Sequence, residues 1–231
     1  MRKKTAEKLE RISKLGYEDI GSSFDVTRKK YSWPEIDCFI RGISSGDSII
    51  DIGCGNGRLF PRLPRGIKYL GVDTSQSLIR TAKINFPEAR FENLDGANMA
   101  SIDDEKFDWA FSLAVWHHFA GERNKIKFLN EIARVIKPGG RVIISVWDIL
   151  GNKHLRWRVF KSRFFCILSL RFNLWNDIVF PWRSSDGKII GMRYYHIFSP
   201  KEIRKIFALS NLSLISLEKS GGNYWLEAKR K

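Results

Sequence analysis

The chain of 231 residues is predicted to fold as one doubly wound α/β domain, and acidic residues at the ends of apolar runs carry this prediction. Three successive apolar runs with strand character end at Asp51, Asp73 and Asp95. A glycine-rich segment begins at the first of these acids. Because the carboxyl ends of parallel strands meet at one edge of such a sheet, we expect these three carboxylates to lie around one ligand.

The first strand, residues 48–50, leads into the segment Asp51-Ile52-Gly53-Cys54-Gly55-Asn56-Gly57. Glycines at alternate positions allow a tight turn and let the backbone approach a ligand closely. The dinucleotide fingerprint G-x-G-x-x-G places its third glycine one residue later, and the acid before the glycines would repel a pyrophosphate. That acid suits a cationic group instead. The alternative is a glycine-rich turn between a buried strand and a helix, with no ligand.

The next two strands, residues 67–72 and 89–94, end at Asp73 and at Asp95-Gly96. Asp73 follows the glycine loop by the ~20 residues at which a βαβ unit places the acid that binds a ribose. Each acid alone is also typical of a helix cap or a turn. Three acids at the ends of three successive strands favour a binding site.

The remaining elements complete an alternating order. We expect a strand at 107–112, a helix at 124–136 that Pro138-Gly139-Gly140 ends, a strand at 141–147, a helix at 200–209, and final strands at 212–218 and 224–229. Toward the N-terminus, residues 2–15 are expected to form a short, mostly exposed helix, and Pro34 suits the first turn of a helix that runs to about residue 41. The irregular stretch between them is expected to fold over the ligand as a lid.

The net charge of +15 indicates a polyanionic partner. Residues 151–205 hold twelve Lys and Arg against three Asp and Glu, and aromatic residues alternate with the basic ones. Such a surface is suited to phosphates and unpaired bases. One alternative is an insertion with its own aromatic core and a solvated basic face, because apolar residues recur at helical spacing at Trp157, Phe160, Phe164 and Leu168. The other alternative is a basic helix that lies on an anionic membrane surface.

Cysteine usage and hydropathy predict a soluble, cytoplasmic protein without a metal site. Cys38, Cys54 and Cys166 lie far apart, with no C-x-x-C pair. The apolar stretch 164–170 is far shorter than the ~20 residues of a membrane span. No secretory signal opens the chain.

The pattern D-x-G-x-G-x-G resembles the first motif of class I S-adenosylmethionine-dependent methyltransferases, and Lys-Pro-Gly-Gly before a strand recurs in that superfamily. Further segments together resemble the tRNA wobble-uridine carboxymethyl methyltransferase family, from about Tyr17 to the C-terminus. These segments are Thr27-Arg28, Trp33-Pro34, Ala114-Val115-Trp116-His117-His118-Phe119, Pro181-Trp182, Arg193-Tyr194-Tyr195-His196 with Phe198, and Gly222-Asn223-Tyr224-Trp225.

The resemblance implies a Rossmann-like, mostly parallel sheet of seven strands whose last strand is antiparallel, with a basic helical insertion after strand 5. It also implies methyl transfer from S-adenosylmethionine to the carboxylate of 5-carboxymethyluridine at the wobble position. Residues 1–45 would form N-terminal helices and a lid, 46–149 the cofactor-binding core, 150–198 the basic aromatic insertion, and 199–231 a C-terminal helix and strand pair.

The resemblance assigns roles to single residues. Arg28 and Arg193 would grip the substrate's carboxylate or a neighbouring phosphate, and His117 would donate a hydrogen bond in the pocket while His118 caps a helix or packs. Tyr195 and His196 would stack on or hydrogen-bond an extruded base, whereas Tyr194 and Phe198 would pack inward. The expected cofactor residues are Asp51, Gly53, Cys54, Gly55, Asn56, Gly57, Asp73, Thr74, Leu94, Asp95, Gly96, Ser112 and Ala114.

The expected partner is the anticodon stem-loop of a tRNA, bound through the insertion, and relatives in eukaryotes use a small activator protein. The sequence is also compatible with two other functions. One is methylation of a small-molecule, lipid or quinone-type acid. The other is a catalytically silent tRNA-binding subunit that retains the fold.

Overall fold

A computed structural model of the protein describes residues 1, 3–19, 33–151, 156–157, 159, 176–183 and 187–231. Arg28, the expected lid segment 20–32 and most of the aromatic residues of the insertion lie outside the described residues. Among the helices described, none is long and apolar enough to cross a membrane.

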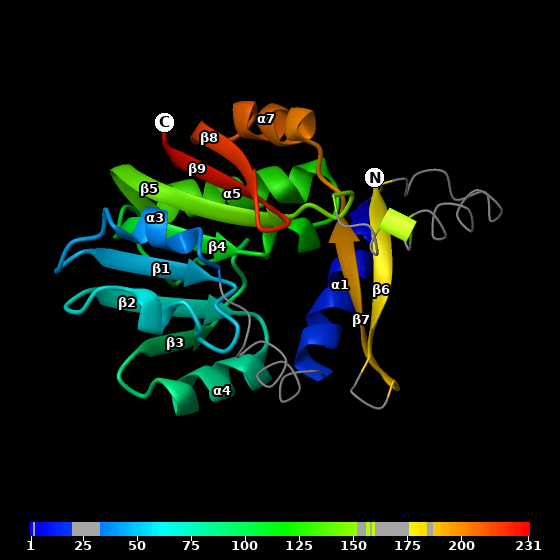
Figure 1. Cartoon of the computed structure of the whole chain (residues 1–231), viewed down its shortest axis with the longest axis horizontal. Helices are drawn as coiled ribbons and strands as arrows, with labels where there is room; N and C mark the ends of the chain where they lie inside the picture. The colour runs from blue at the N-terminus through cyan, green and yellow to red at the C-terminus, as the bar shows by residue number, and fades with distance from the viewer. Residues whose placement is uncertain (2, 20–32, 152–155, 158, 160–175, 184–186) are drawn as a thin grey trace.

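Seven strands form one mixed sheet in the order β3-β2-β1-β4-β5-β9-β8 (Figure 1). The first five strands pair in parallel, and β9 pairs antiparallel with both β5 and β8. The strand order reverses direction after β1, so the crevice between β1 and β4 is where such sheets bind ligands. The predicted mostly parallel sheet with an antiparallel last strand is therefore confirmed. The strands are β1 (Ser48–Ile52), β2 (Lys68–Asp73), β3 (Arg90–Asn93), β4 (Phe107–Leu113), β5 (Ile136–Trp147), β8 (Leu212–Ser220) and β9 (Asn223–Arg230).

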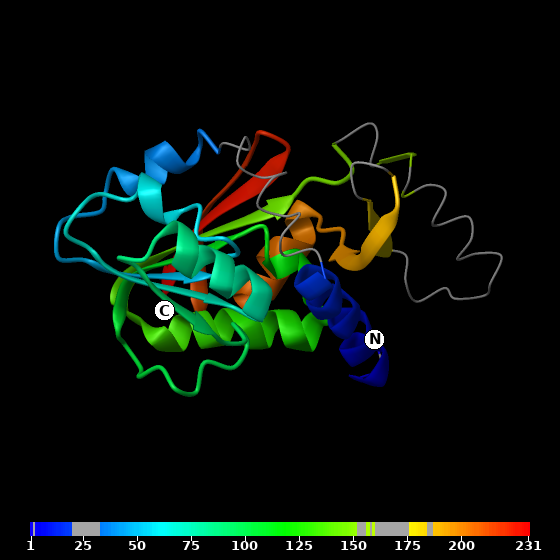
Figure 2. The same cartoon turned by 90° about the horizontal axis from the view of Figure 1, so that it is seen from below.

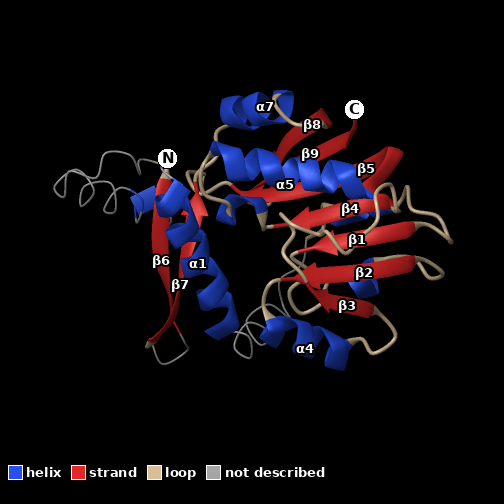
Figure 3. Ribbon diagram, turned by 180° about the vertical axis from the view of Figure 1, so that it is seen from behind, coloured by secondary structure: helices blue, strands red, loops and turns tan. Residues whose placement is uncertain are grey.

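Helices cover both faces of this sheet (Figures 2 and 3). On one face, α5 and α7 bury Phe128, Ile132 and Ile206 against the strands. On the other face, α3 and α4 bury Ile36 and Ile79 in a second cluster. The helices are α1 (Lys3–Asp19), α3 (Ile36–Ile40), α4 (Gln76–Asn85), α5 (Glu122–Val135) and α7 (Pro200–Ala208), with 3-10 turns η1 (Phe60–Arg62) and η2 (Trp116–His118).

The described end of the insertion is a β-hairpin rather than a helix. Strands β6 (Asp177–Arg183) and β7 (Ile189–His196) pair antiparallel in a small sheet of their own. Pro181 lies in β6, and proline is tolerated in an edge strand. Phe160, Phe164 and Leu168, for which the sequence predicts a helix, lie outside the described residues. The hairpin is not part of the predicted architecture.

Helix α1 packs along β7 and closes one side of the molecule (Figure 1). It runs four residues beyond its predicted end and buries Ala6 and Leu9 against Tyr194. The Ser13 hydroxyl donates to the Tyr194 carbonyl at 3.2 Å and accepts from the Tyr194 N–H at 3.0 Å. Leu15, on the same helix, is 53% exposed. The helix is thus a wall of the structure and not a mostly exposed appendage.

Gly16→Ala tests this docking. A β-carbon at Gly16 would come within 2.0 Å of the Met192 carbonyl oxygen. Helix propensity favours Ala over Gly by about 1 kcal/mol, so an exposed position would become more stable. We expect the opposite, a lower melting temperature in thermal unfolding, because the clash outweighs propensity. The exposed α1 variant Glu7→Ala is the control, and a raised melting temperature for Gly16→Ala would contradict the docking.

Candidate functional site

The glycine loop after β1 forms the floor of a pocket at the carboxyl edge of the sheet. Gly53, Gly55 and Gly57 all have positive φ, at 77°, 57° and 81°. The N–H groups of Gly53 and Cys54 both donate to the Val72 carbonyl, at 2.7 and 3.0 Å, which ties the loop to β2. A β-carbon at Gly53 would lie 2.2 Å from Val115 Cγ2, so only glycine fits beside the loop that follows β4.

Two carboxylates, Asp51 buried and Asp73 half-buried, lie in this floor. Asp73, at the end of β2, accepts from the Gly55 N–H and the Ser75 N–H, each at 2.9 Å, and burial raises its pKa. Asp51 is 3% exposed and accepts from the Tyr69 hydroxyl at 2.9 Å. Burial raises the pKa of Asp51 to about 7, although the Tyr69 hydrogen bond and the charge of Arg58 act in the opposite direction. A cationic ligand group would relieve this desolvation.

The third acid, Asp95, lies in the turn after β3. One of its oxygens accepts from the Ala97 N–H at 2.9 Å, and the other is 2.7 Å from the Lys14 ammonium of α1. The three acids predicted from strand ends therefore do line one pocket, as their common position at the sheet edge requires. Of the other expected cofactor residues, the same pocket is lined by Gly53, Cys54, Gly55, Thr74, Leu94, Gly96 and Ala114, whereas Asn56, Gly57 and Ser112 lie outside its lining.

The two histidines after β4 occupy the 3-10 turn η2 and not a strand. The structure places His118 in the pocket wall, whereas His117, for which the sequence predicts that role, is 1% exposed behind it. His118 Nδ1 lies 2.7 Å from the Tyr194 carbonyl, which only accepts, so this nitrogen carries the proton. The Tyr17 hydroxyl then donates to Nε2 at 3.0 Å. Burial lowers the pKa of His118 to about 4, so the ring is neutral.

His117 is also neutral, because burial and the neighbouring His118, Arg193 and His196 lower its pKa well below the usual value. The Trp147 N–H donates to His117 Nδ1 at 3.4 Å, which leaves the proton on Nε2. Among the described residues, Nε2 has no hydrogen-bond partner although it is buried. The sequence cannot predict which ring nitrogen of His117 or His118 carries the proton, because backbone groups of the distant residues Trp147 and Tyr194 decide it.

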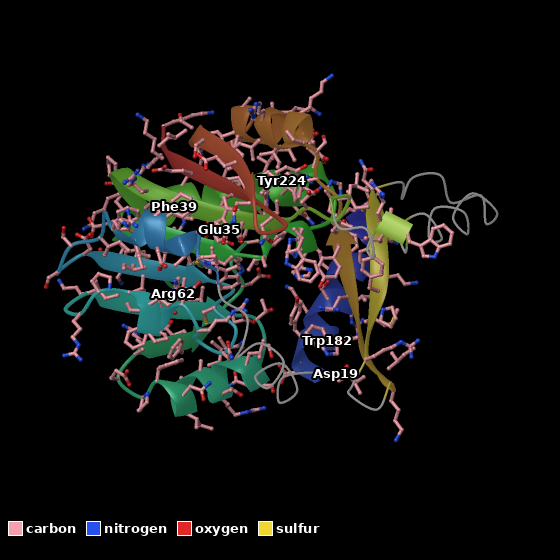
Figure 4. All side chains as sticks on the ribbon, viewed as in Figure 1. Asp19, Glu35, Phe39, Arg62, Trp182 and Tyr224 are labelled. Carbon is pink, nitrogen blue, oxygen red and sulfur yellow. The ribbon has the colours of Figure 1, made fainter. Side chains whose placement is uncertain are left out.

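Arg193, a residue of β7, lies next to His117 and His118. Its guanidinium stacks over the Trp182 ring at 3.8 Å and lies 5.4 Å from the Tyr195 ring centre. Figure 4 labels Trp182 on the hairpin near the end of α1, and it packs there against Leu78 and Tyr17. Arg193 Nε and Nη1 are buried and have no hydrogen-bond partner in the part of the chain that the structure describes. Two unused donors on a fixed cation suit an anion.

Tyr195 and His196 are both buried, at 0% and 6% exposure, so neither presents an open face to a base. The Tyr195 ring stacks on Trp147, with 5.0 Å between the ring centres, and also contacts the rings of His117 and His118. His196 has both ring nitrogens against carboxylates, Asp177 at 2.8 Å and Glu202 at 2.7 Å. Tyr194 and Phe198 pack inward, the arrangement that the sequence predicts for them.

Several pocket residues have no signal in the sequence. Glu10, Ser13, Lys14 and Tyr17 of α1 line the pocket because the helix docks across its mouth. Arg58 and Trp33 also line it, and the guanidinium lies 3.7 Å from the Trp33 ring centre. Arg58 directly follows the glycine loop, and this position in the sequence is the only sign that its side chain lies at the pocket. In the described residues, no group of three or more His, Cys, Asp or Glu side chains is arranged to hold a metal ion.

Comparison with known proteins identifies a methyltransferase domain in this chain. Residues 50–144 match the model of the family described as "Methyltransferase domain". The tRNA (carboxymethyluridine(34)-5-O)-methyltransferase of Schizosaccharomyces pombe is 27% identical and aligns with 93% of this chain and 94% of its own length. A Mus musculus protein with the same enzyme name is 35% identical over 132 residues, and this chain spans only 19% of its length.

Solved structures share the fold. A SAM-dependent methyltransferase from Methanosarcina mazei has a TM-score of 0.66 at 19% identity, covering 86% of this chain and 98% of its own. A chain of the complex between the Haloferax volcanii Trm112 methyltransferase activator and a methyltransferase has a TM-score of 0.65 at 17% identity. That match covers 93% of this chain and 97% of the other.

Gly53→Ala and Gly139→Ala together test the close approach at the pocket floor. Both glycines have φ of 77°, but a β-carbon at Gly139 meets nothing within 4 Å. Both variants carry the same left-handed backbone strain, so their difference isolates the contact with Val115. We expect Gly53→Ala to lose about 1–3 kcal/mol more unfolding free energy than Gly139→Ala in urea titrations. Equal losses would show that the loop has room for a side chain.

Proposed function

Because this chain is a class I S-adenosylmethionine-dependent methyltransferase, we propose that its acceptor is a tRNA carrying 5-carboxymethyluridine at the wobble position. The observation that carries the proposal is the likeness to the S. pombe enzyme over nearly the whole of both chains. A likeness confined to residues 50–144 would support methyl transfer alone. The alignment with the S. pombe enzyme covers 93% of this chain, so it extends far beyond the residues of the methyltransferase family model.

The residues of the pocket fit S-adenosylmethionine. Asp51 would face the ammonium group, Asp73 the ribose hydroxyls, and Asp95 the adenine amino group, while the glycine loop admits the ligand close to the backbone. The buried Asp51, with its raised pKa, is the observation that favours a cationic ligand over a phosphate. The cofactor supplies a methyl group on a sulfonium, with neutral S-adenosylhomocysteine sulfur as the leaving group.

The acceptor carboxylate needs no base, because it is already ionised at neutral pH. Its oxygen forms the new bond to the methyl carbon as the carbon–sulfur bond breaks, and no proton moves. Arg193 Nε and Nη1, with His117 Nε2–H as a further donor, would hold the carboxylate. These atoms are buried behind the pocket lining, so the side chains in front of them would have to move when the acceptor binds. Arg28 keeps its predicted role as a second cation. The neutral states of His117 and His118 agree with a reaction that requires orientation and water exclusion.

The outer side of the hairpin would contact the RNA. Arg183 and Lys188 are exposed there, and Trp157, at 60% exposure, lies in the preceding segment. Exposed cations neutralise phosphates, and an exposed indole can stack on an unpaired base. A small activator protein is the second proposed partner, in line with the fold shared with the H. volcanii chain.

The direct test incubates the protein with methyl-labelled cofactor and total tRNA, with and without an activator protein, and identifies the methylated nucleoside by mass spectrometry. We expect label in the methyl ester of 5-carboxymethyluridine, and binding that weakens steeply with salt. Label in a small acid with a salt-independent Michaelis constant would replace tRNA as acceptor. Cofactor binding without any transfer would instead indicate a silent tRNA-binding subunit.

Asp73→Ala and Arg193→Gln separate the two halves of the site. We expect Asp73→Ala to abolish cofactor binding in calorimetry, because the ribose would lose its acceptor. Arg193→Gln should leave the cofactor Kd within about twofold and lower kcat/KM by about 100-fold or more, because the acceptor loses its charged clamp. Arg123→Gln, on the exposed side of α5, is the control. Parallel loss of binding and transfer in both variants would contradict these roles.

The raised pKa of Asp51 predicts a pH dependence of cofactor binding. Only the ionised carboxylate attracts the ammonium, and with a pKa of about 7 it becomes protonated as the pH falls below 7. Affinity should therefore be roughly tenfold weaker at pH 6 than its plateau value above neutrality. Asp51→Asn should bind weakly with little change between pH 6 and 7.5. A flat profile in the wild-type protein would remove Asp51 from the ammonium site.

A further inference from the structure

His196 lies at the centre of a buried ionic cluster behind the acceptor side of the pocket. Its Nδ1 is 2.8 Å from Asp177 Oδ1, and its Nε2 is 2.7 Å from Glu202 Oε1. The Tyr194 hydroxyl also donates to Asp177, and the Lys125 ammonium, on a side chain only 2% exposed, lies 3.4 Å from Glu202. Five side chains thus satisfy one another, and Glu202, at 25% side-chain exposure, is the most exposed of them.

The protonation state of His196 follows from these partners. Each carboxylate also has a donor other than His196, since the Tyr194 hydroxyl donates to Asp177 and the Lys125 ammonium donates to Glu202. Ionised carboxylates only accept hydrogen bonds. Both ring nitrogens of His196 therefore donate, which requires the imidazolium form. With Lys125, the cluster then holds two positive and two negative charges.

The cluster joins four elements at the base of the hairpin. Asp177 begins β6 and His196 ends β7, and the two residues are cross-strand partners. Glu202 lies in the first turn of α7, and Lys125 lies in α5. Arg193 precedes His196 by three residues on β7, so the position of this strand decides where its guanidinium lies relative to the η2 histidines.

We propose that His196 is a doubly protonated positioning residue, which ties β7 to α5 and α7 so that Arg193 is held ready for the acceptor carboxylate. The inference rests on the proposed function for the identity of that acceptor. It replaces the direct contact with an extruded base that the sequence predicts for His196, because both nitrogens are already used inside the protein.

The first test is nitrogen NMR of the wild-type protein labelled with 15N-histidine at neutral pH. The chain has four histidines, and the resonances lost in His196→Gln identify this residue. We expect two protonated ring nitrogens for His196 and one for His118. A bare ring nitrogen at His196 would overturn the proposal. This measurement needs no acceptor. If His196→Gln fails to fold, variants of the other three histidines identify their resonances, and the remaining ones belong to His196.

The second test is kinetic. In His196→Gln, we expect the KM for tRNA to rise on the order of tenfold or more, since a small displacement of the clamp weakens acceptor binding, while the cofactor Kd stays within about twofold. Lys205→Gln, in a surface ion pair with Glu122 between the same two helices, is the matched control and should change neither value. An unchanged KM in folded His196→Gln, or a cofactor Kd that rises in parallel with it, would overturn the positioning role.

The two proposals fail in different ways. If tRNA is not the acceptor, the wild-type protein itself transfers no methyl group to it, and the nitrogen spectrum alone then decides the state of His196. If the acceptor is tRNA and His196 has no positioning role, wild-type transfer is normal and His196→Gln behaves like Lys205→Gln.

Discussion

The carboxylate of Asp73 is the constraint on which the pocket depends. It accepts the Gly55 and Ser75 N–H groups, and so joins the glycine loop after β1 to the end of β2. Burying a charge without partners is costly, and these donors offset that cost within the protein. The carboxylate is therefore already oriented before a ligand arrives, which reduces the ordering that binding requires.

The opposite side of the pocket is formed by α1, which packs along β7 of the hairpin. Glu10 accepts from the Ala120 N–H, Lys14 pairs with Asp95, and Glu18 accepts from the Ser75 hydroxyl. Helix α1 is thereby bound to elements that lie far apart in the sequence. In the proposed assignment, the sheet edge would bind the cofactor and Arg193 of the hairpin would bind the acceptor, so the two substrates would meet between two independently supported surfaces.

The three acids of the pocket could be predicted because their signals are local. Asp51, Asp73 and Asp95 each end an apolar run, and parallel topology brings strand ends together. The acceptor side could not be predicted in the same way. The choice between His117 and His118 depends on a 3-10 turn and on the distant Tyr194 carbonyl. Likewise, His196 sits beside aromatic residues in the sequence, and only the fold brings Glu202 and Asp177 to its two nitrogens.

A crystal structure with S-adenosylhomocysteine bound would test whether the sheet edge holds the cofactor. We expect both ribose hydroxyls within hydrogen-bond distance of Asp73, the amino group beside Asp51, and the sulfur directed toward the turn that carries His118. A ligand bound elsewhere, or a ribose turned away from Asp73 in this pocket, would contradict the assignment of the sheet edge as the cofactor site.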